Sequence, residues 1–188
     1  MNVNVDISFK TQIRGYDLTF NSTWGLFSPK SIDAGTRLLI DCIDIHTDDI
    51  CLDLGCGYGA VGIAMAKCAE PSEVYMVDKD FVAVEYARMN IENNKLKNCH
   101  VLLSNGFSHL PDIQFDIIAS NLPANIGNEL MKIFFNDAKR FLKKNGRLYV
   151  VTIAGLKDFI KRNFIETFGN HKKIKQRNTH TVSMAILS

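Results

Sequence analysis

The sequence predicts an α/β protein with a mainly parallel, seven-stranded sheet, helices on both faces and an antiparallel C-terminal hairpin. From residue 50 onward, short apolar segments alternate with helical ones, the pattern of repeated strand–helix units. A glycine-rich segment over 55–59 joins one strand to the next helix, as expected where a doubly wound sheet binds a ligand. The last two strand-like segments are close in sequence, which favours an antiparallel pair at the sheet edge.

Length and composition indicate a single domain over residues 1–188. The chain has 188 residues, of which 46% are hydrophobic and 22% charged, as in ordinary globular proteins. No apolar run approaches the length of about 18 residues that a membrane span needs, and the N-terminus has no apolar signal region. We therefore expect a cytoplasmic monomer or homodimer without a membrane partner.

The N-terminal segment predicts a small β extension followed by a helix. Residues 4–11 and 16–21 alternate apolar and polar side chains around an Arg-Gly turn, which predicts a hairpin. With the loop that follows, this hairpin forms an extension of the domain over 1–30. Ser31 is expected to cap a helix over 31–44, because its hydroxyl can accept a bond from the first free amides.

The remaining elements follow from the alternation of apolar segments with helical periodicity. Strands are predicted at 50–54, 73–78, 100–104, 115–120, 147–153, 171–176 and 180–187, and helices at 59–69, 81–94, 126–143 and 155–168. No repeat or linker divides the chain, so these elements are expected to share one fold.

The strongest local motif is the glycine-rich segment after the strand at 50–54, with Asp53, Gly55, Gly57 and Gly59. Glycines let the backbone turn sharply and let a ligand approach without a Cβ in the way. The spacing Gly55-x-Gly57-x-x-Ala60 also fits a dinucleotide pattern, and a plain strand–helix turn is a third interpretation. The third glycine and the carboxylate of Asp53 favour a cationic cofactor over a pyrophosphate, which prefers neutral amides.

Two later loops supply further candidate contacts. Asp78 ends the next strand, 23 residues after Gly55, where a carboxylate can accept both ribose hydroxyls; a helix cap is the alternative. Asn105-Gly106-Phe107 follows another strand. An amide there can reach an adenine amine and Phe107 can pack on the adenine ring, the alternative being an ordinary Asn-Gly turn.

Asn121 stands at the end of a buried apolar strand, followed by Leu122 and Pro123. An Asn carbonyl oxygen and a neighbouring backbone carbonyl can both accept hydrogen bonds from one amino group. This arrangement positions the nitrogen for in-line attack on a methyl donor. Asn121 and Pro123 are therefore the candidate catalytic residues, with a plain turn as the alternative, since Asn and Pro both favour turns.

The charge is unevenly distributed along the chain. Residues 1–131 carry 9 Lys and Arg against 17 Asp and Glu, whereas residues 132–177 carry 13 against 3. A basic segment after an acidic one predicts contact with a nucleic-acid backbone, the alternative being solvated helix faces. The candidate contacts are Lys139, Arg140, Lys143, Lys144, Arg147, Lys172, Lys173, Lys175 and Arg177.

Cysteine spacing argues against a metal site or a disulfide framework. The five cysteines are Cys42, Cys51, Cys56, Cys68 and Cys99. They include no C-x-x-C pair and no zinc-type spacing with histidine. We expect reduced, mostly buried thiols.

Taken together, the motifs resemble the methyltransferase small domain family of class I S-adenosylmethionine-dependent methyltransferases, over about residues 20–188. The resemblance is carried by the segments 25–28, 32–39, 52–59 and 120–123 together with Asp78. It implies a Rossmann-like fold, S-adenosyl-L-methionine as the cofactor, and an acceptor nitrogen held by Asn121 and Pro123. The implied cofactor contacts are Phe27, Asp53, Gly55, Cys56, Gly57, Gly59, Asp78, Lys79, Asn105, Gly106, Phe107 and Asn121.

The segment at Asn121 resembles a motif that, in methyltransferases acting on exocyclic amino or amide nitrogens, usually continues with two prolines and an aromatic residue. Here Leu122 replaces the first proline and Ala124 replaces the aromatic residue that stacks on a target base, and Phe27 is a candidate substitute for that ring. The resemblance implies methylation of an exocyclic amino group of an RNA base, guanine N2 of ribosomal or transfer RNA above all, with residues 132–177 facing the RNA. A protein glutamine or small-molecule N-methyltransferase and a non-catalytic cofactor- or RNA-binding protein are the alternatives.

Overall fold

The computed structural model describes residues 6–68, 73–124 and 127–188. Three parts of the expected elements fall outside these ranges: residues 4–5 of the first strand, residue 69 at the end of one helix, and residue 126 at the start of another.

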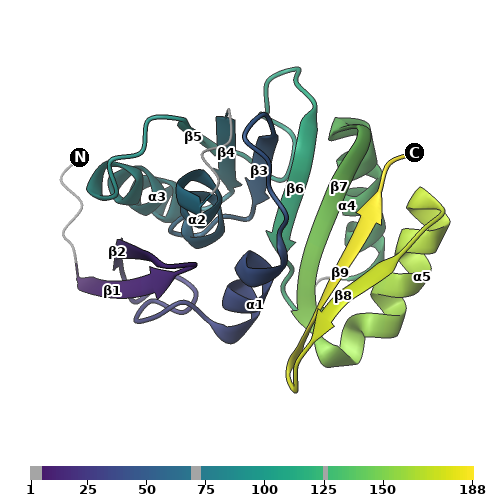
Figure 1. Ribbon diagram of the computed structural model, residues 1–188, viewed down its shortest axis with the longest axis horizontal. Coiled ribbons are helices and arrows are strands. Elements are labelled where there is room, and N and C mark those ends of the chain that lie inside the picture. Colours follow the sequence, from purple (N-terminus) through teal and green to yellow (C-terminus); the bar gives the residue numbers. More distant parts are fainter. Residues whose placement is uncertain (1–5, 69–72, 125–126) are drawn as a thin grey trace.

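The main sheet has seven strands, as predicted (Figure 1). Their order is β5 (Cys99–Leu103), β4 (Glu73–Asp78), β3 (Ile50–Leu54), β6 (Phe115–Asn121), β7 (Leu142–Ile153), β9 (His180–Ile186) and β8 (Lys172–Gln176). The first five run parallel, whereas β9 is antiparallel to both β7 and β8. The predicted α/β architecture with an antiparallel C-terminal hairpin is confirmed.

Burial explains why β9, and not β8, takes the inner position of the hairpin. Residues 181–185 of β9 are buried in succession. β8 has the sequence KKIKQ and exposes every residue except Ile174, which is half-buried. Lysines suit an edge strand that faces water.

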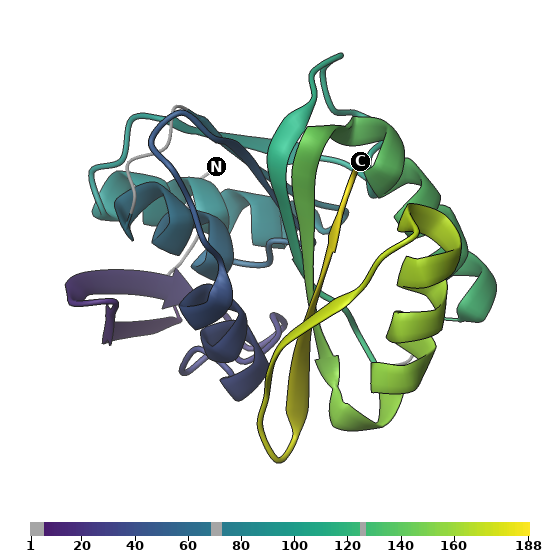
Figure 2. The ribbon, with the colours of Figure 1, turned by 45° about the vertical axis from the view of Figure 1, so that its right-hand side comes forward.

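Helices cover both faces of the sheet (Figure 2). α1 (Ala34–Cys42), α2 (Ala60–Cys68) and α3 (Phe81–Asn93) contribute to one apolar core, and α4 (Asn128–Phe141) and α5 (Lys157–Phe168) contribute to the other. Cys51 of β3 belongs to the first core and Leu52 to the second, because successive side chains of a strand point to opposite faces.

The N-terminal hairpin is a separate two-stranded sheet of β1 (Ile7–Ile13) and β2 (Tyr16–Ser22). The buried side chain of Asn90, on α3, fastens it. Its Oδ1 accepts from the Asn21 amide at 2.7 Å, and its Nδ2 donates to the carbonyl oxygens of Asn21 and Tyr58, both at 2.9 Å. Because Tyr58 belongs to the glycine-rich turn, Asn90 links the hairpin to that turn.

Several element boundaries differ from the prediction. Asp33 caps α1, since its carboxylate accepts from the Gly35 amide at 2.8 Å and from the Thr36 amide at 3.3 Å, so the predicted cap at Ser31 is wrong. Ser31 stays in the preceding loop, where its carbonyl oxygen accepts from Ser28 Oγ at 2.7 Å. β7 begins directly after α4, earlier than expected, and a short 3-10 turn precedes α5.

Replacing Asn90 with Ala leaves the polar groups of Asn21 and Tyr58 without their partner. We expect the free energy of unfolding to fall by about 2–4 kcal/mol. The amides of β1 and β2 should exchange faster relative to those of the main sheet. Asn93→Ala, at an exposed position of the same helix, is the matched control. Hydrogen exchange measures the protection of each amide in both variants. Equal protection of the hairpin in Asn90→Ala and Asn93→Ala would contradict the role of Asn90.

Candidate active site

A cavity of about 660 Å³ opens at the carboxyl ends of the parallel strands. This is the edge where open α/β sheets bind ligands. Most of the residues predicted from the sequence line it: Phe27, Asp53, Gly55, Cys56, Gly57, Asp78, Lys79, Asn105, Gly106, Asn121 and Pro123. Gly59 and Phe107 were also predicted, and they do not line the cavity.

The glycines of the turn have two different tasks. Gly55 and Gly57 have φ values of 77° and 56°, and a Cβ built on either meets nothing within 4 Å. The backbone there can be approached closely by a ligand. Gly59, with φ 93°, packs inward, where a Cβ would lie 3.1 Å from Ile63 and 3.4 Å from Ala87. Gly59 therefore serves the packing of the turn.

Asp78 is positioned by the turn that it faces. Its Oδ2 accepts from the Gly57 amide at 2.9 Å, and its Oδ1 accepts from the Asp80 amide at 2.9 Å. Each carboxylate oxygen can accept more than one hydrogen bond, so the side chain is held in place and still able to bind hydroxyl groups.

Asp53 contributes a buried carboxylate to the same cavity. It is 1% exposed, and its Oδ2 accepts from the Gly62 amide at 2.7 Å. Burial raises the pKa of Asp53 to about 7; the Gly62 amide opposes this shift and the Asp78 carboxylate adds to it. A cation bound in the cavity would stabilise the ionised form.

The loop after β5 brings Asn105 and Gly106 to the cavity but turns Phe107 away from it. The Phe107 ring is buried in the second core and stacks on Phe141 with centroids 5.0 Å apart. The sequence prediction placed Phe107 against a bound ring, but burial against other aromatic side chains determines its position. Phe134, which contacts Phe107 edge-on, lines the cavity instead.

Asn121 is oriented by two residues of the α1 N-terminus. Its Nδ2 donates to Thr36 Oγ1 at 2.9 Å and to Asp33 Oδ2 at 3.3 Å. Because an ionised carboxylate can only accept, this pairing assigns the nitrogen end of the amide to Asp33. Among the described residues nothing donates to Asn121 Oδ1, so this oxygen is available as an acceptor.

The loop between β2 and α1 exposes two aromatic rings, of which the ring of Phe27 lies at the cavity. Phe27 lines the cavity although its side chain is 72% exposed. Trp24 is 66% exposed, and Lys30 Nζ lies 4.5 Å from the centre of its ring. An exposed flat ring at a cavity mouth, such as that of Phe27, is suited to stacking on a planar ligand.

Sequence reasoning missed several residues of the cavity, among them Asp33, Thr36, Phe134 and His180. A signal existed for Asp33 and Thr36, which belong to the segment 32–39 that carries the family resemblance. None existed for His180, because the contact depends on the tertiary fold. A Cβ at Gly35 would lie 2.7 Å from His180 Cδ2, so α1 and the start of β9 approach closely.

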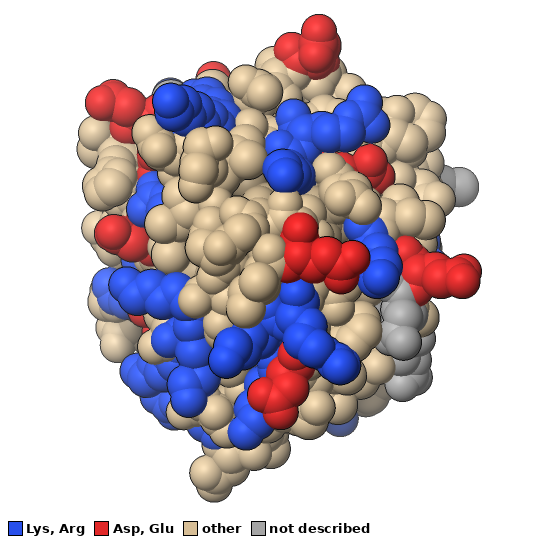
Figure 3. Space-filling view, turned by 90° about the vertical axis from the view of Figure 1, so that its right-hand side faces the viewer, with Lys and Arg blue, Asp and Glu red and all other residues tan. Residues whose placement is uncertain are grey.

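The basic residues of 132–177 do not form a single surface. Lys143 lies 2.7 Å from Asp116 and Arg147 lies 2.9 Å from Asp49, at the amino ends of the strands, opposite the cavity. Figure 3 shows other Lys and Arg side chains gathered on the lower half of the face that β8 and α5 form.

The cysteines are all free thiols. Burial raises the pKa of the Cys99 thiol to about 12, and it raises the pKa of Cys51 and Cys56 as well, which keeps these groups protonated and unreactive. The described residues include no cluster of His, Cys, Asp and Glu suited to a metal ion. No helix among them has the length and apolar character of a membrane span.

Comparison with known sequences gives a consistent result. A family model described as the methyltransferase small domain matches residues 17–184. The uncharacterized protein YbxB of Bacillus subtilis (strain 168) is 34% identical over 142 residues, which are 74% of this chain and 71% of YbxB.

Solved structures agree with the sequence comparison. The T. thermophilus 16S rRNA N2 guanine methyltransferase RsmC, in complex with AdoMet and guanosine, matches with a TM-score of 0.87 and 28% identity over 96% of this chain. The chain spans half of that protein, 50% of its length. An M. jannaschii tRNA m1G methyltransferase shares the fold, with a TM-score of 0.70 and 18% identity over 100% of this chain and 59% of its own.

Replacing Asp53 with Asn tests the energetic cost of the buried carboxylate. Protonated Asp53 is compatible with burial, so the wild type incurs no penalty for this residue below about pH 4. The penalty grows as the pH rises and is complete above the folded-state pKa of about 7. The uncharged variant keeps an oxygen for the Gly62 amide. We therefore expect it to exceed the wild type in unfolding free energy at pH 8 by up to about 4 kcal/mol, and by less at pH 5.

Urea titrations of the protein without cofactor at the two pH values measure this difference. Asp112→Asn, in an exposed loop, is the control. An advantage of Asp53→Asn that is no larger at pH 8 than at pH 5 would show that the carboxylate is not destabilised by burial.

Proposed function

The chain belongs to the methyltransferase small domain family, whose members use S-adenosylmethionine, and from this premise we propose which group it methylates. The proposed acceptor is an exocyclic amino nitrogen of an RNA base, guanine N2 of ribosomal or transfer RNA above all. One observation carries the proposal: the Asn121 amide is held by its nitrogen, so that its oxygen is left to accept.

The residues of the cavity fit the cofactor. Asp78 is held at the rim with acceptor capacity for two ribose hydroxyls, and Gly55 and Gly57 leave room beside the backbone. Asp53 offers a carboxylate to the cationic amino acid part of the cofactor. Asn105 supplies an amide for the adenine amine. When bound, the cofactor supplies a methyl group on a positively charged sulfur.

The acceptor side of the site is built around Asn121. Its Oδ1 can accept one N–H of an amino group, which directs the nitrogen lone pair toward the methyl group. Asp33 and Thr36 prevent the amide from rotating, so the geometry exists before the acceptor arrives. Alignment of this kind accounts for much of the rate of an in-line transfer.

Aromatic side chains near the acceptor site favour a planar acceptor. Phe27 is exposed at the mouth, and Phe134 lines the wall, whereas Ala124 offers no ring. Stacking of a base on such a ring is worth about 1–3 kcal/mol. These rings supply the role that the residue at 124 cannot. The T. thermophilus relative, an N2 guanine methyltransferase solved with guanosine, supports a guanine base as the acceptor.

Replacing Asn121 with Ala removes the proposed acceptor oxygen. We expect methyl transfer from radiolabelled S-adenosylmethionine to unmodified rRNA or tRNA transcripts to fall by about 100-fold. Thr36→Val loosens the amide but leaves Asp33, and a loss of about tenfold is expected. Binding of S-adenosylhomocysteine shows that the variants still fold, and Asn93→Ala is the matched control.

The acceptor is identified in the same assay by offering cell protein and small molecules separately. Label in RNA that survives Asn121→Ala would refute the role of Asn121. Label in protein or in small molecules alone would replace the RNA proposal with one of those acceptors. Cofactor binding without transfer to any fraction would indicate a non-catalytic protein.

A further inference from the structure

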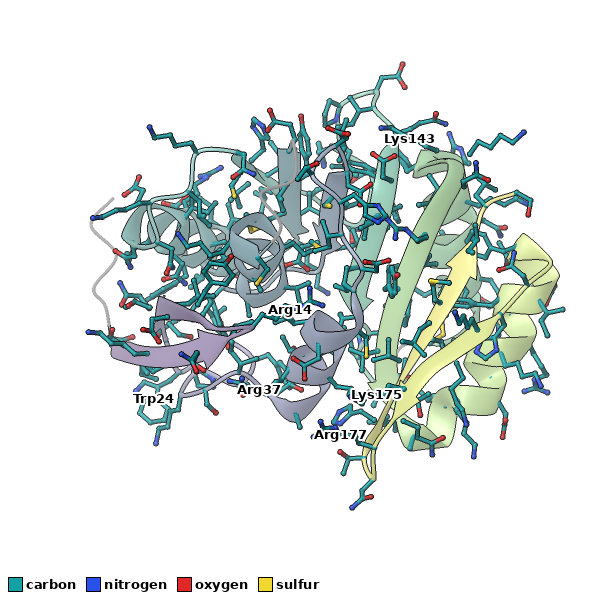
Figure 4. The ribbon with its side chains drawn as sticks, viewed as in Figure 1. Arg14, Trp24, Arg37, Lys143, Lys175 and Arg177 are labelled. Carbon is teal, nitrogen blue, oxygen red and sulfur yellow. The ribbon has the colours of Figure 1, made fainter. Side chains whose placement is uncertain are left out.

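We propose that phosphate groups of the RNA bind a track of four cations beside α1, an inference that rests on the function proposed above. This α1 track consists of the exposed residues Arg14, Arg37, Lys175 and Arg177. Figure 4 shows the four around α1, and Lys143 at the opposite end of the sheet. They come from distant parts of the chain, so the charge distribution along the sequence does not reveal the track.

The two arginines at the N-terminal end of the chain are held by neutral acceptors. Arg14 Nη2 donates to the carbonyl oxygen of Ile43 at 2.6 Å. Arg37 donates to Thr11 Oγ1 at 2.7 Å and to the carbonyl oxygen of Gln12 at 3.1 Å. These bonds order both guanidinium groups without neutralising them. An ordered, charged guanidinium with free N–H groups is suited to binding phosphate.

Lys175 and Arg177 face the same helix from the side of β8. Burial raises the pKa of the Cys42 thiol on α1, and Asp41 adds to this effect, while Lys175, Arg14 and Arg177 oppose it. Cations from the N-terminal hairpin, from β8 and from the turn after β8 therefore act on the end of α1 at Cys42, where they outnumber the carboxylate of Asp41. Such a local excess of positive charge attracts a polyanion.

Four other cations of the basic segment pair with carboxylates: Lys132, Arg140, Lys143 and Arg147. Lys143 pairs with Asp116, and Arg147 pairs with Asp49. Within the described ranges, none of the four residues of the α1 track forms an ion pair. The charge of the track is thus available to a ligand.

The α1 track is continuous with the cavity. The amide of Arg177 donates to the carbonyl oxygen of His180 at 2.8 Å, and His180 lines the cavity. Arg37 directly follows Thr36, which lines the cavity as well. The nine residues of α1 extend over about 13 Å. That length accommodates the phosphates of a few nucleotides; in a duplex, one strand has a phosphate about every 3.4 Å along the helix axis.

Protection of an edge strand is the competing explanation for the lysines of β8, because charged side chains discourage pairing with another chain. This explanation covers Lys172, Lys173 and Lys175. It does not cover Arg37, on a helix, or Arg14, in a hairpin turn. Phosphate binding accounts for all four positions of the track.

Binding of the full chain to a fluorescein-labelled, single-stranded 20-nucleotide RNA tests the proposal. Lys175→Gln/Arg177→Gln removes two charges of the track. Lys95→Gln/Lys97→Gln removes two exposed charges in the loop before β5, outside the basic segment, and is the matched control. At 0.1 M salt we expect about tenfold weaker binding by the track variant and a decrease of about one to two in the slope of log K against log salt. The control should stay within about twofold.

Arg14→Gln/Arg37→Gln is the second variant, measured together with its melting temperature. If both track variants keep the wild-type affinity and salt slope while the wild type methylates RNA, RNA phosphates do not bind the α1 track, and the proposed function stands. If the variants lose RNA binding but the wild type methylates no RNA, the track stands and the proposed function fails. Loss of transfer to cell protein, with RNA binding unchanged, would assign the surface to an acidic protein and overturn the proposal.

Discussion

The carboxylate of Asp33 starts α1 and holds the Asn121 amide at the same time, and the geometry of the site depends on this shared residue. It accepts from the amides of Gly35 and Thr36 at the first turn and from Asn121 Nδ2 at the end of β6. The start of the helix and the orientation of the amide are therefore set together. Tyr58 adds a link from the glycine-rich turn, since its hydroxyl donates to carbonyl oxygens of the loop before α1.

A second constraint is the cost of keeping a carboxylate in the cavity. Asp53 is almost fully buried, and burial opposes its ionisation more strongly than the Gly62 amide favours it. An apolar side chain would fill the same place without this cost. A strongly perturbed carboxyl group in a cleft marks a functional position more often than a structural one. The Asp53 carboxylate is therefore kept in the site although its burial lowers the stability of the fold.

Local sequence patterns predicted those parts of the molecule that depend on local chemistry. The strand–turn–helix unit around the glycine-rich turn, the places of Asp53 and Asp78 at strand ends, and the edge hairpin all follow from periodicity and spacing. The position of Phe107 could not be predicted in this way. Its ring could pack either in the core or in the cavity, and tertiary contacts determine that it packs in the core. His180 and the α1 track depend on which distant segments the fold brings together, and no local pattern contains that information.

The contact between Gly35 and His180 has a consequence for the order in which the molecule is assembled. Gly35 leaves room for the His180 ring, and β9 then pairs with β7 along seven residues. β9 is the last of the described strands in sequence, yet it lies inside the sheet. During synthesis, the wall of the cavity that His180 forms cannot close until residues 180–186 have emerged. Pairing between such distant segments is slow to form. A nascent chain that ends before residue 180 already holds the glycine-rich turn and Asn121, yet it still lacks the His180 wall of the cavity.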